Sequence, residues 1–317
     1  MHPASSVILF TTLSGAGYGL LGWLGLYAAA GLLPMQLLFG IAAMLVGLGS
    51  VTIGLLSSTL HLGHPERAWR ALSQWRTSWL SREGIASIVT YIPALLFGFG
   101  WVIGGPLRGW LMLIGPVLTL CAIVTVICTA YIYRSLKPIP RWSNGWVVPN
   151  YLSLAAMTGA VLLAGLARAF AMPLPSIDII AGVTVIAALA LKLAYWWVTD
   201  RAKPVSTPES ATGLGAIGTV RLFEAPHTSE NYLLKEMGYR IARKHAVKLR
   251  VIAVVLAFLV PLALLVSAWK WPMLALPFTV SAPLIAFVGV LTERWLFFAE
   301  ARHVVTLYYG RRLDPAA

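Results

Sequence analysis

The sequence predicts an all-α integral membrane protein, in which eight transmembrane helices form a bundle with both termini in the cytoplasm. Hydrophobic residues fill 59% of the 317 positions and charged residues only 11%, and a water-soluble globule of this composition would expose a large apolar surface. The apolar residues form eight long stretches, and nearly all charged residues lie between them. The unequal distribution of Lys and Arg among the connections predicts the orientation.

Each apolar stretch is long enough to cross a bilayer, because a spanning helix needs about 20 apolar residues at roughly 1.5 Å each. The stretches are continuous rather than alternating, which argues against a membrane β-barrel. The expected spans are residues 7–30, 36–60, 84–104, 110–133, 150–170, 177–198, 251–268 and 273–292.

The first span is rich in glycine, which predicts close contact between helices or room for a flat ligand. These glycines are Gly15, Gly17, Gly19, Gly22 and Gly25. No Lys or Arg precedes the span, so we expect a retained helix rather than a signal peptide. In the fourth span Cys121 and Cys128 lie about 10 Å apart along one helix, too far for a disulfide, and are expected to be packing residues.

The connections after even-numbered spans, with the C-terminal tail, hold nineteen Lys and Arg residues. The opposite side holds only Arg108, Arg168 and Lys270, so the positive-inside rule predicts that both termini are cytoplasmic. Residues 1–317 are expected to form a single membrane anchor domain. The cytoplasmic loop 199–250 should include an amphipathic helix from Ser229 to Arg250, bound either to anionic lipid or to a protein partner.

Ionisable side chains at membrane depth are costly and therefore informative. His61, Glu83, Lys192, Glu293 and Arg294 all fall in the cytoplasmic third, which predicts a polar pocket bounded by four helices. Structural explanations compete with this. Lys192 is expected to extend along the membrane to the inner surface, Glu293 and Arg294 to form an interfacial ion pair, and His61 is as readily a hydrogen-bond partner as a reactive group.

Metal and haem sites are weakly supported. His61 and His64 are three residues apart, but Pro65 follows and no Cys or carboxylate completes a zinc-like spacing. The histidines lie near span boundaries or loops rather than deep within spans, and iron–sulfur motifs are absent.

The segment from Ser57 to Gly84, SSTLHLGHPERAWRALSQWRTSWLSREG, resembles the membrane anchor subunits of dimethyl sulfoxide reductase and related molybdenum oxidoreductases. The resemblance implies an anchor for an iron–sulfur subunit and a molybdopterin catalytic subunit, which exchanges electrons with a membrane quinone, ubiquinone or menaquinone. No haem or iron–sulfur cluster is expected in this protein. The expected quinone-binding residues, with Arg82 included as the neighbour of Glu83, are His61, Arg67, Arg82, Glu83 and Arg294.

The predicted orientation, and the opening MHPASSVILFTTLSGAGYGLLG, are similar to the sulfite dehydrogenase branch of this family, whose catalytic subunits stay inside. We therefore expect a multi-pass protein of a bacterial inner membrane that passes electrons from cytoplasmic sulfite oxidation to quinone. The alternatives are a quinol-oxidising anchor of a dimethyl sulfoxide reductase-type complex, a passive anchor, and a secondary transporter. Transporters place ionisable groups near the midplane, where most of these spans have none.

Overall fold

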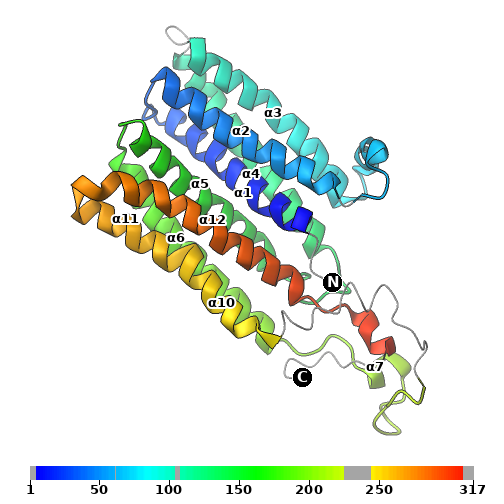
Figure 1. Cartoon of the computed structure of the whole chain (residues 1–317). Helices are drawn as coiled ribbons and strands as arrows, with labels where there is room; N and C mark the ends of the chain where they lie inside the picture. Colours follow the sequence, from blue (N-terminus) through cyan, green and yellow to red (C-terminus); the bar gives the residue numbers. More distant parts are fainter. Residues whose placement is uncertain (1–4, 61, 104–107, 225–243, 310–317) are drawn as a thin grey trace.

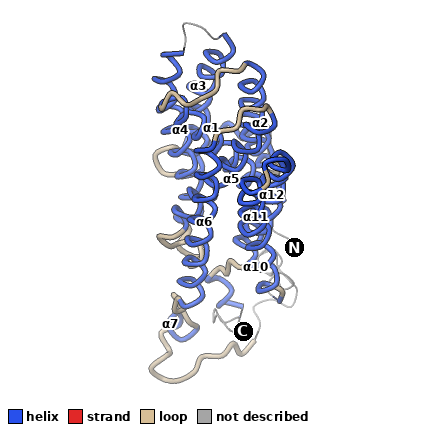
Figure 2. The backbone as a smooth tube through the Cα atoms, turned by 90° about the vertical axis from the view of Figure 1, so that its left-hand side faces the viewer, coloured by secondary structure: helices blue, strands red, loops and turns tan. Residues whose placement is uncertain are grey.

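The computed structural model describes residues 5–60, 62–103, 108–224 and 244–309, and their dominant feature is eight long apolar helices (Figure 1). Each is long and apolar enough to cross a membrane. They are α1 (Ser5–Ala29), α2 (Leu37–Thr59), α3 (Trp79–Ile103), α4 (Arg108–Arg134), α5 (Val147–Ala169), α6 (Pro175–Arg201), the continuous run α10 (Ala246–Val254), η3 (Val255–Leu259) and α11 (Val260–Lys270), and α12 (Ala275–Ala299). The described residues contain no strand (Figure 2). The all-α prediction is thus confirmed.

Shorter elements connect these helices: η1 (Pro65–Gln74), α7 (Pro208–Thr212), η4 (Pro272–Leu274) and η5 (Val304–Tyr309). The helix expected from Ser229 to Arg250 falls mostly outside the described residues, and its last part forms the start of α10.

The spanning helices form two groups of four, α1–α4 and α5–α12, which lie side by side (Figure 1). Within the first group α1 packs on α2 and α4, and α3 packs on α4. Within the second group α5 packs on α6 and α12, and α11 packs on α12. The groups meet chiefly where α1 contacts α5.

Glycines of α1 bring the two groups into backbone contact. A Cβ atom on Gly19 would overlap the carbonyl group of Ala155 in α5, and one on Gly159 of α5 would overlap the backbone of Gly19. Gly17 and Gly25 lie in the same way against α2 and α4. Small residues permit this close approach where helices pack in lipid. The predicted close contacts are therefore confirmed for three of the five glycines of the span.

One turn of the seventh span is a π-helix, Val255–Leu259, in which the N–H of Val260 donates to the carbonyl of Val255. Pro261 follows and has no N–H to donate, which favours a local change in the hydrogen-bond ladder. The backbone of Ala257 in this turn lies against Gly289 of α12, where a side chain would clash. The turn thus fixes α12 closely against its neighbour.

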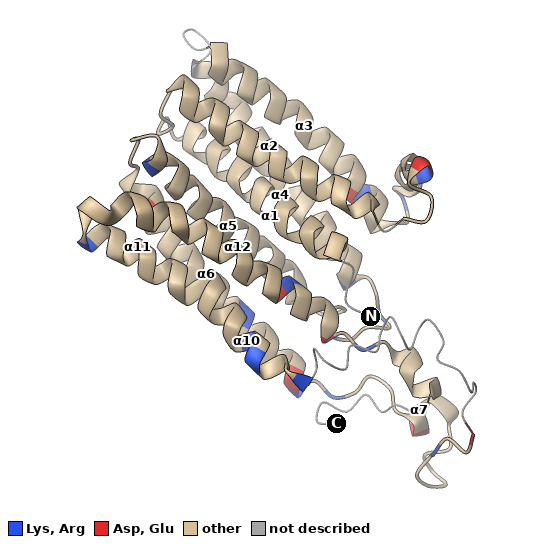
Figure 3. Ribbon diagram, viewed as in Figure 1, with Lys and Arg blue, Asp and Glu red and all other residues tan. Residues whose placement is uncertain are grey.

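Most charged residues gather at one end of the bundle, together with η1, α7 and both ends of the described residues, and a few lie at the opposite end (Figure 3). We call this the charged end. Here the Arg141 guanidinium lies 2.6 Å from Asp200 and 3.1 Å from Glu300, and Arg250 lies 2.5 Å from Asp200 and 2.8 Å from Glu300. These four side chains tie the α4–α5 connection to α6, α10 and α12.

Candidate functional site

Glu83 lies in the second turn of α3, near the charged end, and only 4% of the residue is exposed. The hydroxyl group of Thr129 in α4 lies 3.5 Å from Glu83 Oε1 and 3.0 Å from the carbonyl oxygen of Thr125, so its one hydrogen is shared between these two acceptors. Among the described residues, no Lys, Arg or His forms an ion pair with this carboxylate. A buried carboxyl group with so few hydrogen-bond and ion-pair partners is costly to keep ionised. Such groups are frequent in functional sites.

Arg82 fastens the segment that leads into α3. Its Nε donates to the carbonyl of Trp75 at 2.8 Å and its Nη2 to the carbonyl of Arg76 at 2.6 Å. The guanidinium also lies 4.3 Å from the ring centre of Trp79, which stacks on Tyr131 of α4. Arg82 therefore holds the loop after η1 against the start of α3, beside Glu83.

Arg67 lies on η1, beyond the ends of α2 and α3 (Figure 1). Its side chain is exposed, with Nε 3.7 Å from the carboxylate of Glu66, which also contacts His64 at 3.0 Å. His61 lies outside the described residues. In the sequence it comes two residues after Thr59, the last residue of α2.

Arg294 belongs to a buried group of three charges with Lys192 and Glu293. Lys192 of α6 forms an ion pair with Glu293 of α12, and Arg294 Nε lies 2.5 Å from the other Glu293 oxygen. The three side chains are at most 2% exposed. The Lys192 ammonium also lies 4.3 Å from the Tyr195 ring centre, and the Arg294 guanidinium 4.3 Å from that of Tyr151.

The expectation that Lys192 extends to the membrane surface is wrong. Lys192 precedes the end of α6 by nine residues, about 14 Å along a helix, which exceeds the length of its side chain. Glu293 and two aromatic rings supply partners at its own depth instead. The expected Glu293–Arg294 ion pair is confirmed, although it is buried rather than interfacial.

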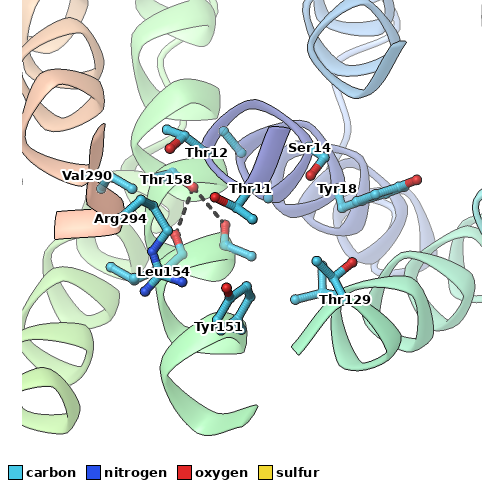
Figure 4. Close-up of a pocket in the computed structure, with 14 residues that line it drawn as sticks. Thr11, Thr12, Ser14, Tyr18, Thr129, Tyr151, Leu154, Thr158, Val290 and Arg294 are labelled. Atoms are coloured by element: carbon cyan, nitrogen blue, oxygen red, sulfur yellow. Dashed lines mark hydrogen bonds between the residues drawn. The ribbon is translucent and has the colours of Figure 1, made fainter. Parts of the chain in front are cut away.

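A polar cavity lies between the two helix groups, toward the charged end (Figure 4). Its volume is about 20 Å³, room for about one or two water molecules. Arg294 lies on one side, and Tyr18 and Thr129 lie on the other. The walls come from α1, α4, α5 and α12: Thr11, Thr12, Ser14, Gly15, Ala16, Tyr18, Val126, Thr129, Tyr151, Leu154, Ala155, Thr158, Val290 and Arg294.

Several polar atoms of this wall have no hydrogen-bond partner among the described residues. They are Arg294 Nη2 and the hydroxyl groups of Thr12, Tyr18 and Tyr151. Buried polar groups are normally paired with protein or ordered water. Because Thr129 both lines the cavity and bonds to Glu83, the structure brings Glu83 and Arg294 to two sides of one polar region, whereas Arg67 lies away on η1.

The sequence predicted a polar pocket bounded by the second, third, sixth and eighth spans, which carry His61, Glu83, Lys192 and Arg294. The observed cavity is instead lined by α1, α4, α5 and α12, so only Arg294 of α12 was expected there, and the hydroxyl groups were not predicted. Thr and Tyr within apolar spans are common and give no signal on their own. The available signal was the spacing of Thr11, Gly15 and Tyr18, which places small or polar residues on one face of the first helix.

The free cysteines Cys121 and Cys128 agree with their expected packing role. Within the described part of the protein, no three His, Cys, Asp or Glu side chains form a cluster suited to a metal ion.

Comparison with known proteins places the sequence in a family. A model of the DMSO reductase anchor subunit (DmsC) family matches residues 1–310. The protein is 36% identical over 328 aligned residues to the C subunit of the sulfite dehydrogenase of Allochromatium vinosum, covering 98% of this sequence and 99% of that protein. It is 29% identical to the C component of the anaerobic dimethyl sulfoxide reductase of Escherichia coli, over 41% of this sequence and 47% of that one. The protein therefore belongs to the DmsC family and is a multi-pass membrane anchor subunit related to that of sulfite dehydrogenase.

Proposed function

We propose that this anchor subunit binds a quinone at its charged end and passes to it electrons from sulfite oxidised in the cytoplasm. A molybdopterin subunit performs the oxidation, and an iron–sulfur subunit relays the electrons. The end-to-end similarity to the sulfite dehydrogenase anchor supports this assignment over the dimethyl sulfoxide reductase role, whose representative matches less than half of the sequence.

The observation that supports the proposal most strongly is the buried carboxyl group of Glu83, for which the described residues supply only one hydroxyl partner. Reduction of a quinone takes up two electrons and two protons, so its site needs proton donors. The reference pKa of histidine, about 6.5, suits His61 as the group that protonates a quinone oxygen near neutral pH. Glu83 then supplies the next proton or orients the imidazole.

The arginines have different roles in this proposal. Arg67, exposed on η1, stabilises a reduced quinone oxygen. Arg82 acts indirectly, because its donors already bind the loop carbonyls. Arg294 faces a cavity of about 20 Å³, which has room for water but not for a quinone ring, so it acts on the site without touching the ring.

The excess of Lys and Arg at the charged end supports a cytoplasmic location for that end in the inner membrane of a bacterium. Reporter fusions to the C-terminus and to the connection between α5 and α6 test this directly. We expect the C-terminal fusion to report cytoplasm and the other to report periplasm. The reverse result would contradict cytoplasmic sulfite oxidation by the attached subunits.

The decisive experiment compares His61→Ala with His64→Ala in the intact complex. His64 is a matched control because it is a histidine only three residues after His61 in the sequence. Its side chain is exposed and pairs with Glu66. We expect His61→Ala to remove sulfite-dependent quinone reduction, while dye-coupled sulfite oxidation persists and His64→Ala retains both. Normal quinone reduction by the His61→Ala complex would remove His61 from the mechanism.

A second candidate, quinol oxidation, is favoured by the similarity to the dimethyl sulfoxide reductase component. The same buried carboxyl group would then accept protons rather than donate them. Turnover of the purified complex with quinol and dimethyl sulfoxide, in the absence of quinone reduction by sulfite, would establish this direction.

A further inference from the structure

The cavity between the helix groups is lined by buried polar groups that could bind ordered water. Arg294 is 2% exposed and lines the cavity, and its Nη2 has no hydrogen-bond partner among the described residues. The hydroxyl groups of Thr12, Tyr18 and Tyr151 are likewise unpartnered and belong to the same wall. Buried polar groups are normally paired with protein or ordered water, so these groups favour a polar occupant.

The size of the cavity decides which occupant fits. A volume of about 20 Å³ exceeds the roughly 10–15 Å³ needed to hold a water molecule. A quinone ring or a phosphate group would need several times that space. The wall also offers the two to four polar partners that a buried water usually has.

The partners of Glu293 exclude it as the mobile proton carrier. Both of its oxygens are engaged, one by Lys192 and the other by Arg294. The group of three has one net positive charge when all are ionised. Since a guanidinium only donates hydrogen bonds, Arg294 Nη2 would face the water oxygen and turn the water hydrogens toward the hydroxyl groups opposite.

Hydroxyl groups on the side of the cavity opposite Arg294 connect the cavity to Glu83. Thr129 lies in the cavity wall and donates to the Glu83 carboxylate. Tyr18 lies on the same side of the cavity as Thr129 (Figure 4). A hydroxyl group can accept a proton from one neighbour and donate another, so this wall is able to pass protons.

We propose that the cavity holds one or two water molecules, oriented by Arg294, which supply protons through the Thr129 hydroxyl group to Glu83. The proton-supply role rests on the proposed function, whereas the hydration itself does not. For each quinone reduced, the two electrons come from the partner iron–sulfur subunit. Each proton that Glu83 releases toward the quinone is replaced through Thr129 from the water, which is reprotonated from the cytoplasm.

The hydration is tested by a structure of the intact complex at a resolution that shows ordered water. We expect one or two density peaks within hydrogen-bonding distance of Arg294 Nη2. In Gly15→Ala at least one peak should be lost, because Gly15 lines the cavity and an added Cβ meets no atom within 4 Å. Gly22→Ala, two turns further along α1, is the control, since its Cβ also meets nothing but lies outside the cavity wall. A cavity without density in the parent protein would overturn the proposal.

The relay is tested by Thr129→Val against Thr125→Val. Both threonines lie on α4 and are buried, but Thr125 bonds to Thr90 and does not line the cavity. We expect Thr129→Val to slow quinone reduction about tenfold or more, part of the roughly 100- to 10,000-fold that positioned proton transfer supplies. The ratio of turnover in H₂O to that in D₂O should also rise. Dye-coupled activity normalises for the amount of assembled complex.

The outcomes separate this inference from the proposed function. Equal quinone reduction by Thr129→Val and Thr125→Val, with His61→Ala inactive, would overturn the relay and leave the quinone site intact. Unchanged quinone reduction in His61→Ala would instead contradict the proposed function, and the ordered water would still report on the cavity.

Discussion

The two helix groups bury a carboxylate in opposite ways. Glu293, in the second group, lies between Lys192 and Arg294 and is fully buried. Glu83, in the first group, is almost as deeply buried, but among the described residues only the Thr129 hydroxyl contacts its carboxyl group. Burial of an ion without a counter-ion costs several kcal/mol, so the second group holds its charge in a stable form, whereas no described counter-ion stabilises a charge on Glu83.

In the proposed function, this difference separates a carboxylate that maintains the fold from one that exchanges protons. Glu293 links α6 to α12 through Lys192 and keeps Arg294 at the cavity wall. Glu83 makes no ion pair with the described residues, so its removal disturbs few contacts. Substitutions at the two carboxylates should therefore give opposite patterns of stability and activity.

The largest expected loss of stability follows Glu293→Gln. This change leaves Lys192 and Arg294 buried without a counter-ion, and breaking a buried ion pair typically costs about 3–5 kcal/mol. Chemical unfolding of the detergent-solubilised subunit would measure the change. Adding Lys192→Met to Glu293→Gln should recover part of the loss, and a Glu293→Gln protein as stable as the parent would contradict the structural role.

A smaller loss is expected when the contact between the two groups is widened. Gly19→Ala places a methyl group against the Ala155 carbonyl, and overpacking of this kind costs about 1–3 kcal/mol. Gly22→Ala adds the same methyl group to the same helix where no atom lies within 4 Å of it. The control should be neutral or more stable by up to roughly 1 kcal/mol through its gain in helix propensity, and equal unfolding free energies for both variants would argue against close packing at Gly19.

The smallest effect on stability, and the largest on activity, is expected for Glu83→Gln. The amide still accepts a hydrogen bond from Thr129, and no described cation loses a partner, so unfolding free energy should change by less than about 1 kcal/mol. Quinone reduction should fall by roughly 100-fold or more, because an amide cannot exchange the proton. A Glu83→Gln protein that is substantially destabilised but fully active would contradict the difference proposed between the two carboxylates.

The sequence predicted most of the fold because each span must satisfy its backbone hydrogen bonds within itself in lipid. This constraint makes hydropathy a local signal, and the expected span 36–60, for example, is observed as Leu37–Thr59. The sequence also predicted that His61 and Glu83 lie at one end of the bundle; the structure places Glu83 near the charged end, and His61 lies outside the described residues. The sequence predicted close helix contacts in the first span but not the packing of Gly19 on Gly159, because the spacing of glycines does not indicate which helix they contact.

The amino-acid sequence by itself determined eight spans, the charged end and the family of anchor subunits to which the protein belongs. Only the tertiary structure decided that Lys192 pairs with Glu293, that Arg82 binds loop carbonyls, and that Thr129 connects Glu83 to a cavity shared with Arg294. The physical reason is distance along the sequence: α1, α4, α5 and α12 meet at this cavity. Its chemistry depends on how their faces turn toward one another, which no single helix encodes.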